Sequence, residues 1–227
     1  MKSIFIYNGS RCKESRSLDV INKIRNQVEL DYDGTIEFNY YDPITSSIKN
    51  CSGCSTCFKT CKCKLDDYDD MKKIRQDMIK SDFIIFASPV YAHNVSGDMK
   101  IFIDRISYWL HYMKLFNKKA IILVSNADNG GKIVIDYLYK IISCLGVSVV
   151  SAYENRFDSD VEKSILDISN QIIYELNVPV RPSRVLEERY ELATDMWRNI
   201  ENSNQHRFLK ENKFFEYKSY EDLLINL

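Results

Sequence analysis

Short apolar runs alternate with stretches of helically spaced apolar residues along most of the chain. Runs of this length are typical of buried strands, and apolar residues at i, i+3 and i+4 are typical of a helix packed on a core. The pattern predicts strands at residues 3–7, 35–41, 83–87, 120–124 and 147–150. It predicts helices at 17–28, 66–80, 99–106, 134–145 and 161–172. Strand 35–41 alternates apolar and polar residues, so we expect it at an edge of the sheet.

Five strands that alternate with five helices predict an α/β domain with a doubly wound parallel sheet. Five strands fit the order 2-1-3-4-5 better than the other common doubly wound order. Ligands of such sheets bind outside the carboxyl ends of the strands, at the point where the strand order reverses. The loops after strands 1, 3 and 4, which are residues 8–17, 88–96 and 125–131, should therefore converge on one site.

The loop between the first strand and the first helix has the features of a phosphate site. Unpaired N–H groups and the positive end of the helix dipole stabilise an anion at a helix N-terminus. Ser10, Ser15 and Ser17 can add hydroxyl donors, and Arg11 or Arg16 can neutralise charge. The alternative is an ordinary helix cap by Ser15 or Ser17, since the loop has neither a P-loop lysine nor three glycines.

The composition of the chain indicates which partners and which cellular compartment to expect. The chain has 227 residues and a net charge of −1, which gives no reason to expect nucleic acid or an anionic membrane as a partner. We see neither a signal peptide nor the ~20 apolar residues of a membrane helix, so we expect a soluble cytoplasmic protein. Seven cysteines in a reducing compartment are more often metal ligands or redox groups than disulfides.

The loop after the third strand carries a recognisable motif. It contains Pro89-Val90-Tyr91, and Met99-Lys100 and Phe102-Ile103-Asp104-Arg105 follow in the next helix. Over about residues 1–175 the chain resembles the flavodoxin-like NADPH-dependent FMN reductase family, whose first loop holds the FMN phosphate. Gly9-Ser10 and residues 15–17 stand at the matching places. Arg11-Cys12 replaces the usual Pro-Arg, and Arg16 replaces a common Asn or Gly, so either arginine could contact the phosphate.

The resemblance implies an FMN site formed by the three loops. Tyr91 would pack on the isoalloxazine ring, or serve as an ordinary packing aromatic, and His93 would either contact a ligand or lie exposed. Residues 125–131 would supply polar groups to the pyrimidine end of the flavin, with glycines that permit close approach. The residues expected to contact FMN are Ser10, Arg11, Ser15, Arg16, Ser17, Pro89, Val90, Tyr91, Asn94, Val95, Ser125, Asn126, Asp128 and Gly130.

Five cysteines lie in one loop, residues 50–64. Cys51, Cys54 and Cys57 form the C-x2-C-x2-C run that leads many iron–sulfur ligand sets, and either Cys61 or Cys63 could be the fourth ligand. The loop is similar to that of iron–sulfur flavoproteins, whose spacing selects Cys63, so the resemblance implies a [4Fe–4S] cluster on Cys51, Cys54, Cys57 and Cys63. Structural zinc, or free and redox-active thiols, are the alternatives. Cys12 and Cys144 are expected to be isolated packed residues.

Two prolines near residue 180 mark a boundary between a domain at 1–176 and a C-terminal extension at 177–227. Ser183 can cap a helix over about 185–200, and the apolar residues after 208 are unlike a disordered tail. The extension could pack on its own domain or on a partner subunit. Flavoproteins of this group often form oligomers, so we expect a homodimer or homotetramer.

The sequence and the resemblance together favour an FMN-dependent NAD(P)H oxidoreductase. The [4Fe–4S] cluster would pass electrons to a small-molecule acceptor or to a ferredoxin-like protein, and no protein side chain needs to act as an acid or base. One alternative is a flavodoxin-type electron carrier without enzymatic activity. Another is a flavoprotein whose cysteine loop binds structural zinc or holds redox thiols.

Overall fold

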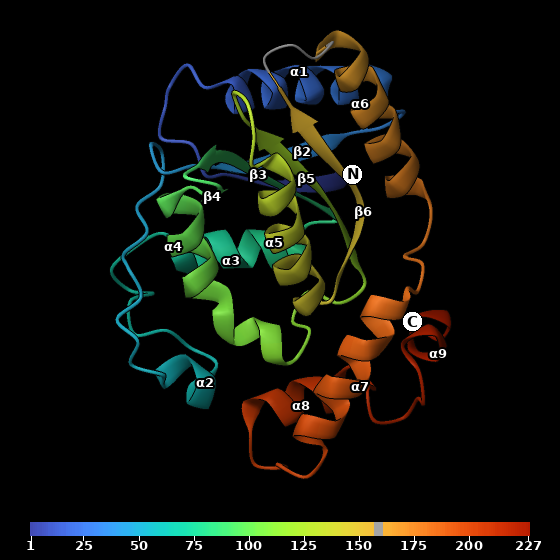
Figure 1. Ribbon diagram of the computed structural model, residues 1–227. Helices are drawn as coiled ribbons and strands as arrows, with labels where there is room; N and C mark the ends of the chain where they lie inside the picture. Colours follow the sequence, from blue (N-terminus) through green and yellow to red (C-terminus); the bar gives the residue numbers. More distant parts are fainter. Residues whose placement is uncertain (157–160) are drawn as a thin grey trace.

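Helices cover both faces of a twisted sheet in the computed structural model, which describes residues 1–156 and 161–227 (Figure 1). Five strands pair in parallel in the order β2-β1-β3-β5-β6, and the short β4 pairs antiparallel with β3. Counted along the chain, these five parallel strands have the predicted order 2-1-3-4-5, with β2 at one edge. The strands are β1 Lys2–Asn8, β2 Ile36–Tyr41, β3 Phe83–Tyr91, β4 Asn94–Val95, β5 Lys118–Ser125 and β6 Val147–Asn155.

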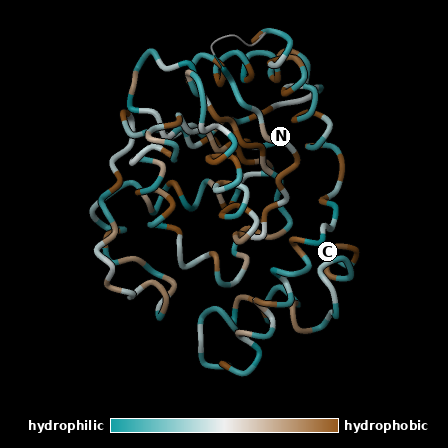
Figure 2. The backbone as a smooth tube through the Cα atoms, viewed as in Figure 1, coloured by the Kyte–Doolittle hydropathy of each residue, from teal (hydrophilic) through white to brown (hydrophobic). Residues whose placement is uncertain are grey.

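The alternation of side chains along the central strands builds two apolar layers. Ile4 and Ile85 belong to the layer beneath α1 (Arg16–Asp31) and α6 (Val161–Asn177). Phe5 and Ile84 belong to the opposite layer, which also contains residues of α3, α4 and α5. Those three helices span Met71–Lys80, Gly97–Ile106 and Gly131–Cys144. Figure 2 shows the hydrophobic residues gathered along the strands and on the inward sides of the helices.

Three elements differ from the prediction. Helix α3 begins at Met71 rather than at residue 66, because the carboxylates of Asp69 and Asp70 accept hydrogen bonds from the backbone of Lys49 and Ser47. Strand β3 runs on to Tyr91 and turns back as β4, where a loop was expected. The cysteine loop contains a short helix, α2 (Thr56–Thr60), and the 3₁₀ helix η1 (Ser107–His111) follows α4.

The C-terminal extension packs on its own chain. It forms α7 Arg184–Arg198, α8 Asn204–Glu211 and α9 Tyr220–Ile225, with Ser183 as the N-cap of α7 as predicted. The hydroxyl of Tyr190 donates to the carbonyls of Phe214 and Tyr217 at 2.6 and 2.9 Å, and Tyr220 accepts from the Asn117 N–H at 3.0 Å. These aromatic residues join the apolar layer of α3, α4 and α5. Among the described helices we find none long and apolar enough to span a bilayer.

Candidate functional site

The loop after β1 leads into a capped helix. Ser15 is the N-cap of α1, and its hydroxyl accepts from the Leu18 N–H at 3.2 Å. The Ser15 and Ser17 hydroxyls lie 3.1 Å apart, and Ser10 and Ser17 are buried. Three serines and the N-terminus of a sixteen-residue helix therefore face one short loop. This arrangement suits an anion such as a phosphate, as the sequence predicts.

Asn8 organises this loop, although the sequence did not single it out. Its side chain is 1% exposed, and its Oδ1 accepts from the Ser10 N–H at 3.2 Å and from the Ser17 hydroxyl at 3.1 Å. Its Nδ2 donates to the hydroxyl of Tyr40, which in turn donates to Asp42 at 2.8 Å. Asn8 thus links the loop that follows β1 to the end of β2. The one signal in the sequence was a polar residue that ends an apolar strand directly before a glycine.

The two candidate arginines are directed away from each other. Arg11 makes a double contact with Asp98 in the first turn of α4, at 3.0 Å from Nε and 2.5 Å from Nη2. Arg16 donates to the Arg156 carbonyl at the end of β6, at 2.7 Å. The side chain of Arg11 is 69% exposed, so its ion pair adds little stability. The structure therefore ties each arginine to a different neighbouring element.

The loop after β3 is a tight hairpin. Tyr91 pairs with Asn94 and Val90 with Val95, and the two residues of the turn, Ala92 and His93, have φ values of 49° and 58°. Both residues of the turn are left-handed, which is typical of a two-residue type I′ turn. Tyr91 is 53% exposed and Asn94 is exposed too, while Pro89 and Val90 are half-buried. The side chain of Val95 lies in the core, so this residue can offer a ligand only backbone atoms.

The loop after β5 contains an acceptor without a partner. Asn126 is 7% exposed, and its Nδ2 donates to Glu154 at 2.5 Å. Its buried Oδ1 has no hydrogen-bond partner among residues 1–156 and 161–227. Buried polar atoms are nearly always paired, so an unpaired acceptor here suits a ligand that donates a hydrogen bond. Ser125 is half-buried and Asp128 is exposed in the same loop.

Close packing joins the three loops at the carboxyl ends of their strands. The Ser96 hydroxyl donates to the Gly9 carbonyl at 2.6 Å, which connects the loop after β1 to the start of α4. A Cβ atom on Gly9 would lie only 2.7 Å from that hydroxyl, and one on Gly130 would lie 3.0 Å from the His93 ring. Ser17 and Ser125 line a shared cavity of about 40 Å³. Arg11 instead lines a separate cavity of about 410 Å³, next to Thr45 and Asp98.

The cysteine loop, residues 50–64, leaves its thiols exposed or half-buried. Cys51 and Cys54 are exposed, while Cys57, Cys61 and Cys63 are half-buried, and all seven cysteines are free thiols. Ser55 and Cys61 bound α2 in left-handed conformations, with φ values of 54° and 55°. Within residues 1–156 and 161–227, we find no group of three or more cysteine, histidine or acidic side chains close enough to hold a metal ion.

Neighbouring charges separate the candidate fourth ligands. Burial raises the pKa of Cys57, and the thiolates of Cys63 and Cys51 raise it further. Burial also raises the pKa of Cys61, which has a hydrogen-bond contact with Tyr112 instead. Hydrogen bonds from Thr56 lower the pKa of Cys54 to about 7, which favours the thiolate that metals bind. Cys51, Cys57 and Cys63 are thus electrostatic neighbours, whereas the neighbour of Cys61 is Tyr112.

Of the two remaining thiols, Cys144 is half-buried at the end of α5. Cys12 is exposed, so the expectation that it is a packed residue is wrong.

A buried ion network lies beneath the cysteine loop. The Arg105 guanidinium at the end of α4 is 0% exposed and pairs with both Asp66 and Asp69, and Arg75 also pairs with Asp66. Arg105 donates to the Lys49 carbonyl at 2.9 Å, just before the loop begins. Burial lowers the pKa of Arg105, but the hydrogen bond and charge of Asp69, together with contact with Cys63, raise it overall. The network therefore fixes the base of the loop, and Cys63 lies next to it.

Comparison with known proteins agrees with this geometry. The NADPH-dependent FMN reductase family matches residues 1–162. An iron–sulfur flavoprotein of Clostridioides difficile is 28% identical over 179 residues, which cover 75% of this chain and 78% of that protein. An iron–sulfur flavoprotein of Archaeoglobus fulgidus is 34% identical over 105 residues, or 45% of this chain and 46% of the relative. The match thus spans about half the length of the Archaeoglobus protein.

Solved structures share the fold at low identity. An NADH:FMN oxidoreductase in its apo form is similar with a TM-score of 0.60 and 17% identity, over 80% of this chain and 92% of that one. An FMN-dependent NADH-azoreductase of Bacillus anthracis, solved with FMN, is similar with a TM-score of 0.58 and 10% identity, over 78% of this chain and 100% of that one. These structures therefore confirm the flavodoxin-like fold that the sequence predicts.

Proposed function

The chain belongs to the NADPH-dependent FMN reductase family, and from that premise we propose that it oxidises NAD(P)H and passes the electrons on through a [4Fe–4S] cluster in its cysteine loop. Membership makes it an FMN-dependent oxidoreductase. The cluster, the electron acceptor and the residues that hold each group are the proposed part.

The contact between the three loops is the observation that carries the flavin site. Ser10, Ser15, Ser17 and the first turn of α1 would bind the phosphate, while Asn8 keeps that loop open. The exposed Tyr91 and Asn94 of the hairpin, with the half-buried Pro89 and Val90, would lie along the ring system. Asn126 Oδ1 would accept from a ring N–H, and the backbone of Gly130 permits close approach. Bound FMN would supply the hydride chemistry, and these residues bind and orient it.

The arginines would have secondary roles at the phosphate. Arg11 is exposed, and its ion pair with Asp98 is weak, so it can turn toward an anion at the loop. Arg16 follows the cap residue directly, and its contact with Arg156 joins the phosphate loop to the end of β6. Ser125, Asp128 and the backbone of Val95 would complete the rim of the site.

The donor set of the cysteine loop fits an iron–sulfur cluster, although the described thiols do not yet surround one. Cys51, Cys57 and Cys63 influence one another electrostatically, and Cys54 is exposed on the same loop. A bound cluster would supply one-electron steps. We assign Cys61 no ligand role because it contacts Tyr112 and is not among the thiols that influence Cys57.

The oligomeric state and the cellular compartment are also part of this proposal. We expect a homodimer or homotetramer that uses a small-molecule acceptor or a ferredoxin-like protein. The seven free thiols suit the reducing cytoplasm, where disulfides are rare.

Anaerobic purification followed by measurement of FMN, iron, sulfide and zinc tests this function. We expect FMN, iron and sulfide together, and bleaching of the flavin by NADH or NADPH. The Cys54→Ala variant should lose the iron–sulfur absorbance and keep FMN, whereas the matched control Cys144→Ala should keep both. Stoichiometric zinc without sulfide would replace the cluster with a structural metal. A flavin reduced only by dithionite or a partner protein would indicate an electron carrier.

A further inference from the structure

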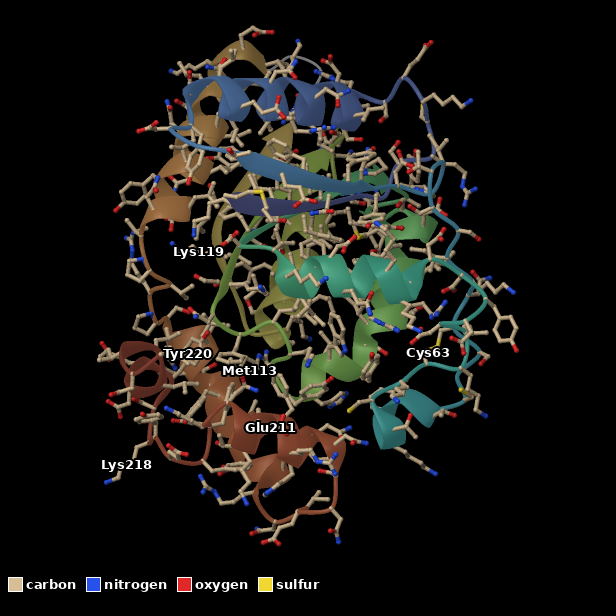
Figure 3. All side chains as sticks on the ribbon, turned by 180° about the vertical axis from the view of Figure 1, so that it is seen from behind. Cys63, Met113, Lys119, Glu211, Lys218 and Tyr220 are labelled. Atoms are coloured by element: carbon tan, nitrogen blue, oxygen red, sulfur yellow. The ribbon has the colours of Figure 1, made fainter. Side chains whose placement is uncertain are left out.

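The C-terminal extension contacts α2, the short helix of the cysteine loop. The family match ends at residue 162, so the whole extension lies outside it. Figure 3 shows α2 beside the helices of the extension, with Cys63 on the loop that follows α2. The Gln205 Nε2 of α8 donates to the Phe58 carbonyl at 2.5 Å, and the Asn204 Nδ2 donates to the Lys59 carbonyl at 3.5 Å. Carbonyls in the last turn of a helix have no partner within that helix, so α8 supplies donors that the end of α2 lacks.

Gln205 is buried at a place that an apolar side chain would fill at a lower cost. It is 1% exposed, and its Oε1 has no hydrogen-bond partner within the part of the chain that the structure describes. A buried acceptor without a partner destabilises a fold. Packing alone therefore does not account for a glutamine here, whereas the hydrogen bond from its Nε2 to Phe58 does.

A second set of contacts supports α2 from η1 and α7. The rings of Phe58 and His111 meet edge to face, with their centres 5.3 Å apart. The Trp197 Nε1 of α7 donates to the His111 carbonyl at 2.7 Å, and Nδ1 of His206 in α8 lies 2.8 Å from the Trp197 carbonyl. Phe58 is thus held at its carbonyl by α8 and contacted at its ring by a residue that α7 fixes.

These contacts distinguish one thiol of the loop from the others. Cys57 directly precedes Phe58 in α2, is half-buried and packs against the apolar layer of α3, α4 and α5. Cys51 and Cys54 precede α2 and are exposed. Residues that hold metal ligands in place contribute to metal affinity. Cys57 is therefore the proposed ligand that the extension can place before a metal binds.

We propose that α8 positions Cys57 for the metal centre of the cysteine loop, with Gln205 as the positioning residue. The inference rests on the proposed function, because Cys57 belongs to the proposed ligand set. It goes beyond that function, because it gives the C-terminal extension a part in metal binding. Cys51 and Cys54 would then close on a thiol that is already in place.

The first test is thiol labelling of the full chain, with FMN bound and its metal removed by a chelator. Gln205→Met keeps the length of the side chain and removes both the Nε2 donor and the unpaired Oε1, so the fold should stay intact. We expect iodoacetamide to label Cys57 about fivefold faster than in the parent protein, because α2 would open more often. The labelling rates of the exposed Cys51 and Cys54, and of the half-buried Cys144 in α5, should change less than about twofold.

The second test is a titration of the same metal-free protein with Co²⁺, followed by the absorbance of its bonds to thiolates. Gln205→Met should raise the Kd for Co²⁺ about fivefold, because the conformation that binds the metal would be less populated. The matched control is Gln171→Met in α6, which loses a hydrogen bond from Nε2 to Glu175 at 3.0 Å and should change neither measurement.

Equal labelling of Cys57 in Gln205→Met and Gln171→Met would overturn the proposal. So would an equal rise in the labelling of Cys144, which would show a general loosening of the fold. A Kd for Co²⁺ that Gln205→Met leaves unchanged would show that α8 supports α2 without placing a ligand. A parent protein that binds no Co²⁺ would overturn the proposal as well.

A second variant covers the case in which Gln205→Met fails to fold, as judged by circular dichroism. Trp197→Phe removes the donor to the His111 carbonyl in the same set of contacts, and the same two increases are expected. Neither measurement uses iron or sulfide. A failure of the proposed cluster therefore shows in the iron and sulfide contents of the purified protein, and not in the labelling rate or in this Kd.

Discussion

The three loops of the proposed flavin site are hydrogen-bonded to one another and to their own strands, whereas the cysteine loop, besides bonds of its own around Thr60, is tied to other elements of the chain. Asn8, Ser15 and Ser96 fix the flavin loops through hydrogen bonds that begin and end within those loops and their own strands. The cysteine loop is fixed at its base by Arg105 and its carboxylates. Near the end of α2 it accepts hydrogen bonds from Gln205 and Asn204 of α8. The difference indicates that the proposed flavin site is formed before its ligand arrives, and that the proposed cluster site depends on its ligand for its final shape.

The largest effect should come from the base of the cysteine loop. Asp69→Asn removes the carboxylate that pairs with the Arg105 guanidinium, which is 0% exposed. Its Nε already lacks a partner within the part of the chain that the structure describes. Breaking one partner of a buried pair costs about 3–5 kcal/mol, so we expect the free energy of unfolding to fall by about 3 kcal/mol. Urea unfolding at a fixed FMN concentration measures this free energy. Asp67→Asn, at an 81% exposed carboxylate, should stay within about 0.5 kcal/mol of the parent protein.

The same pair predicts a pH dependence. Burial raises the pKa of Asp69, but hydrogen bonds from Arg105 and from the backbone of Lys49 and Met71 lower it overall, to below its ordinary value of 3.8. A carboxyl whose pKa is lower in the folded protein stabilises the fold above its unfolded pKa and loses this effect as the pH falls through the folded value. The stability gap between the parent protein and Asp69→Asn should be constant from about pH 5 to about pH 7 and should narrow below about pH 4. A gap that is unchanged in acid would contradict the ion pair.

A substitution in the three flavin loops should change the affinity for FMN more than the stability of the fold. Asn8→Ala leaves the Ser10 N–H and the Ser17 hydroxyl without their acceptor. Each buried group without a partner costs about 1–3 kcal/mol, so we expect the Kd for FMN to rise about 30-fold. Flavin fluorescence titration of the FMN-depleted protein measures this. The control is Asn39→Ala, which removes one hydrogen bond to Ser3 within the sheet and should leave the Kd unchanged. Similar Kd values for the two variants would show that Asn8 does not organise the loop.

The features of the fold and the site that the sequence predicts are those that depend on interactions between residues close together along the chain. Hydrophobic periodicity is local, so it predicts the strands, the helices and therefore the positions of the three loops. The partners of Arg105 lie 36 and 39 residues earlier in the chain, and no local pattern identifies them. The hairpin at Ala92 and His93 was missed for a different reason. Ala92 and His93 are not the Asn-Gly, Asp-Gly or Gly-Gly pair that marks such a turn in a sequence, and His93 packs against Gly130, which is distant along the chain.

A smaller effect separates capping from phosphate binding. Ser15 and Ser183 cap α1 and α7 in the same way, accepting from Leu18 and Leu186 at 3.2 and 3.4 Å. Each change to alanine should lower the free energy of unfolding by about 1 kcal/mol. Only Ser15→Ala should also raise the Kd for FMN, by about fivefold, because Ser183 lies in the C-terminal extension and not in the phosphate loop. If both variants bind FMN as the parent does, Ser15 is a helix cap and nothing more.

The smallest effect concerns the independence of the two regions. The hydrogen bonds that order the flavin loops include no residue of the cysteine loop, residues 50–64. Removing the metal with a chelator should therefore change the Kd for FMN by less than about twofold. The same treatment should speed cleavage by trypsin at Lys59, Lys62 and Lys64, because the loop would lose the ligand that completes its shape. Release of FMN together with the metal would instead show that the two sites form one cooperative unit, and that the flavin loops are not formed in advance.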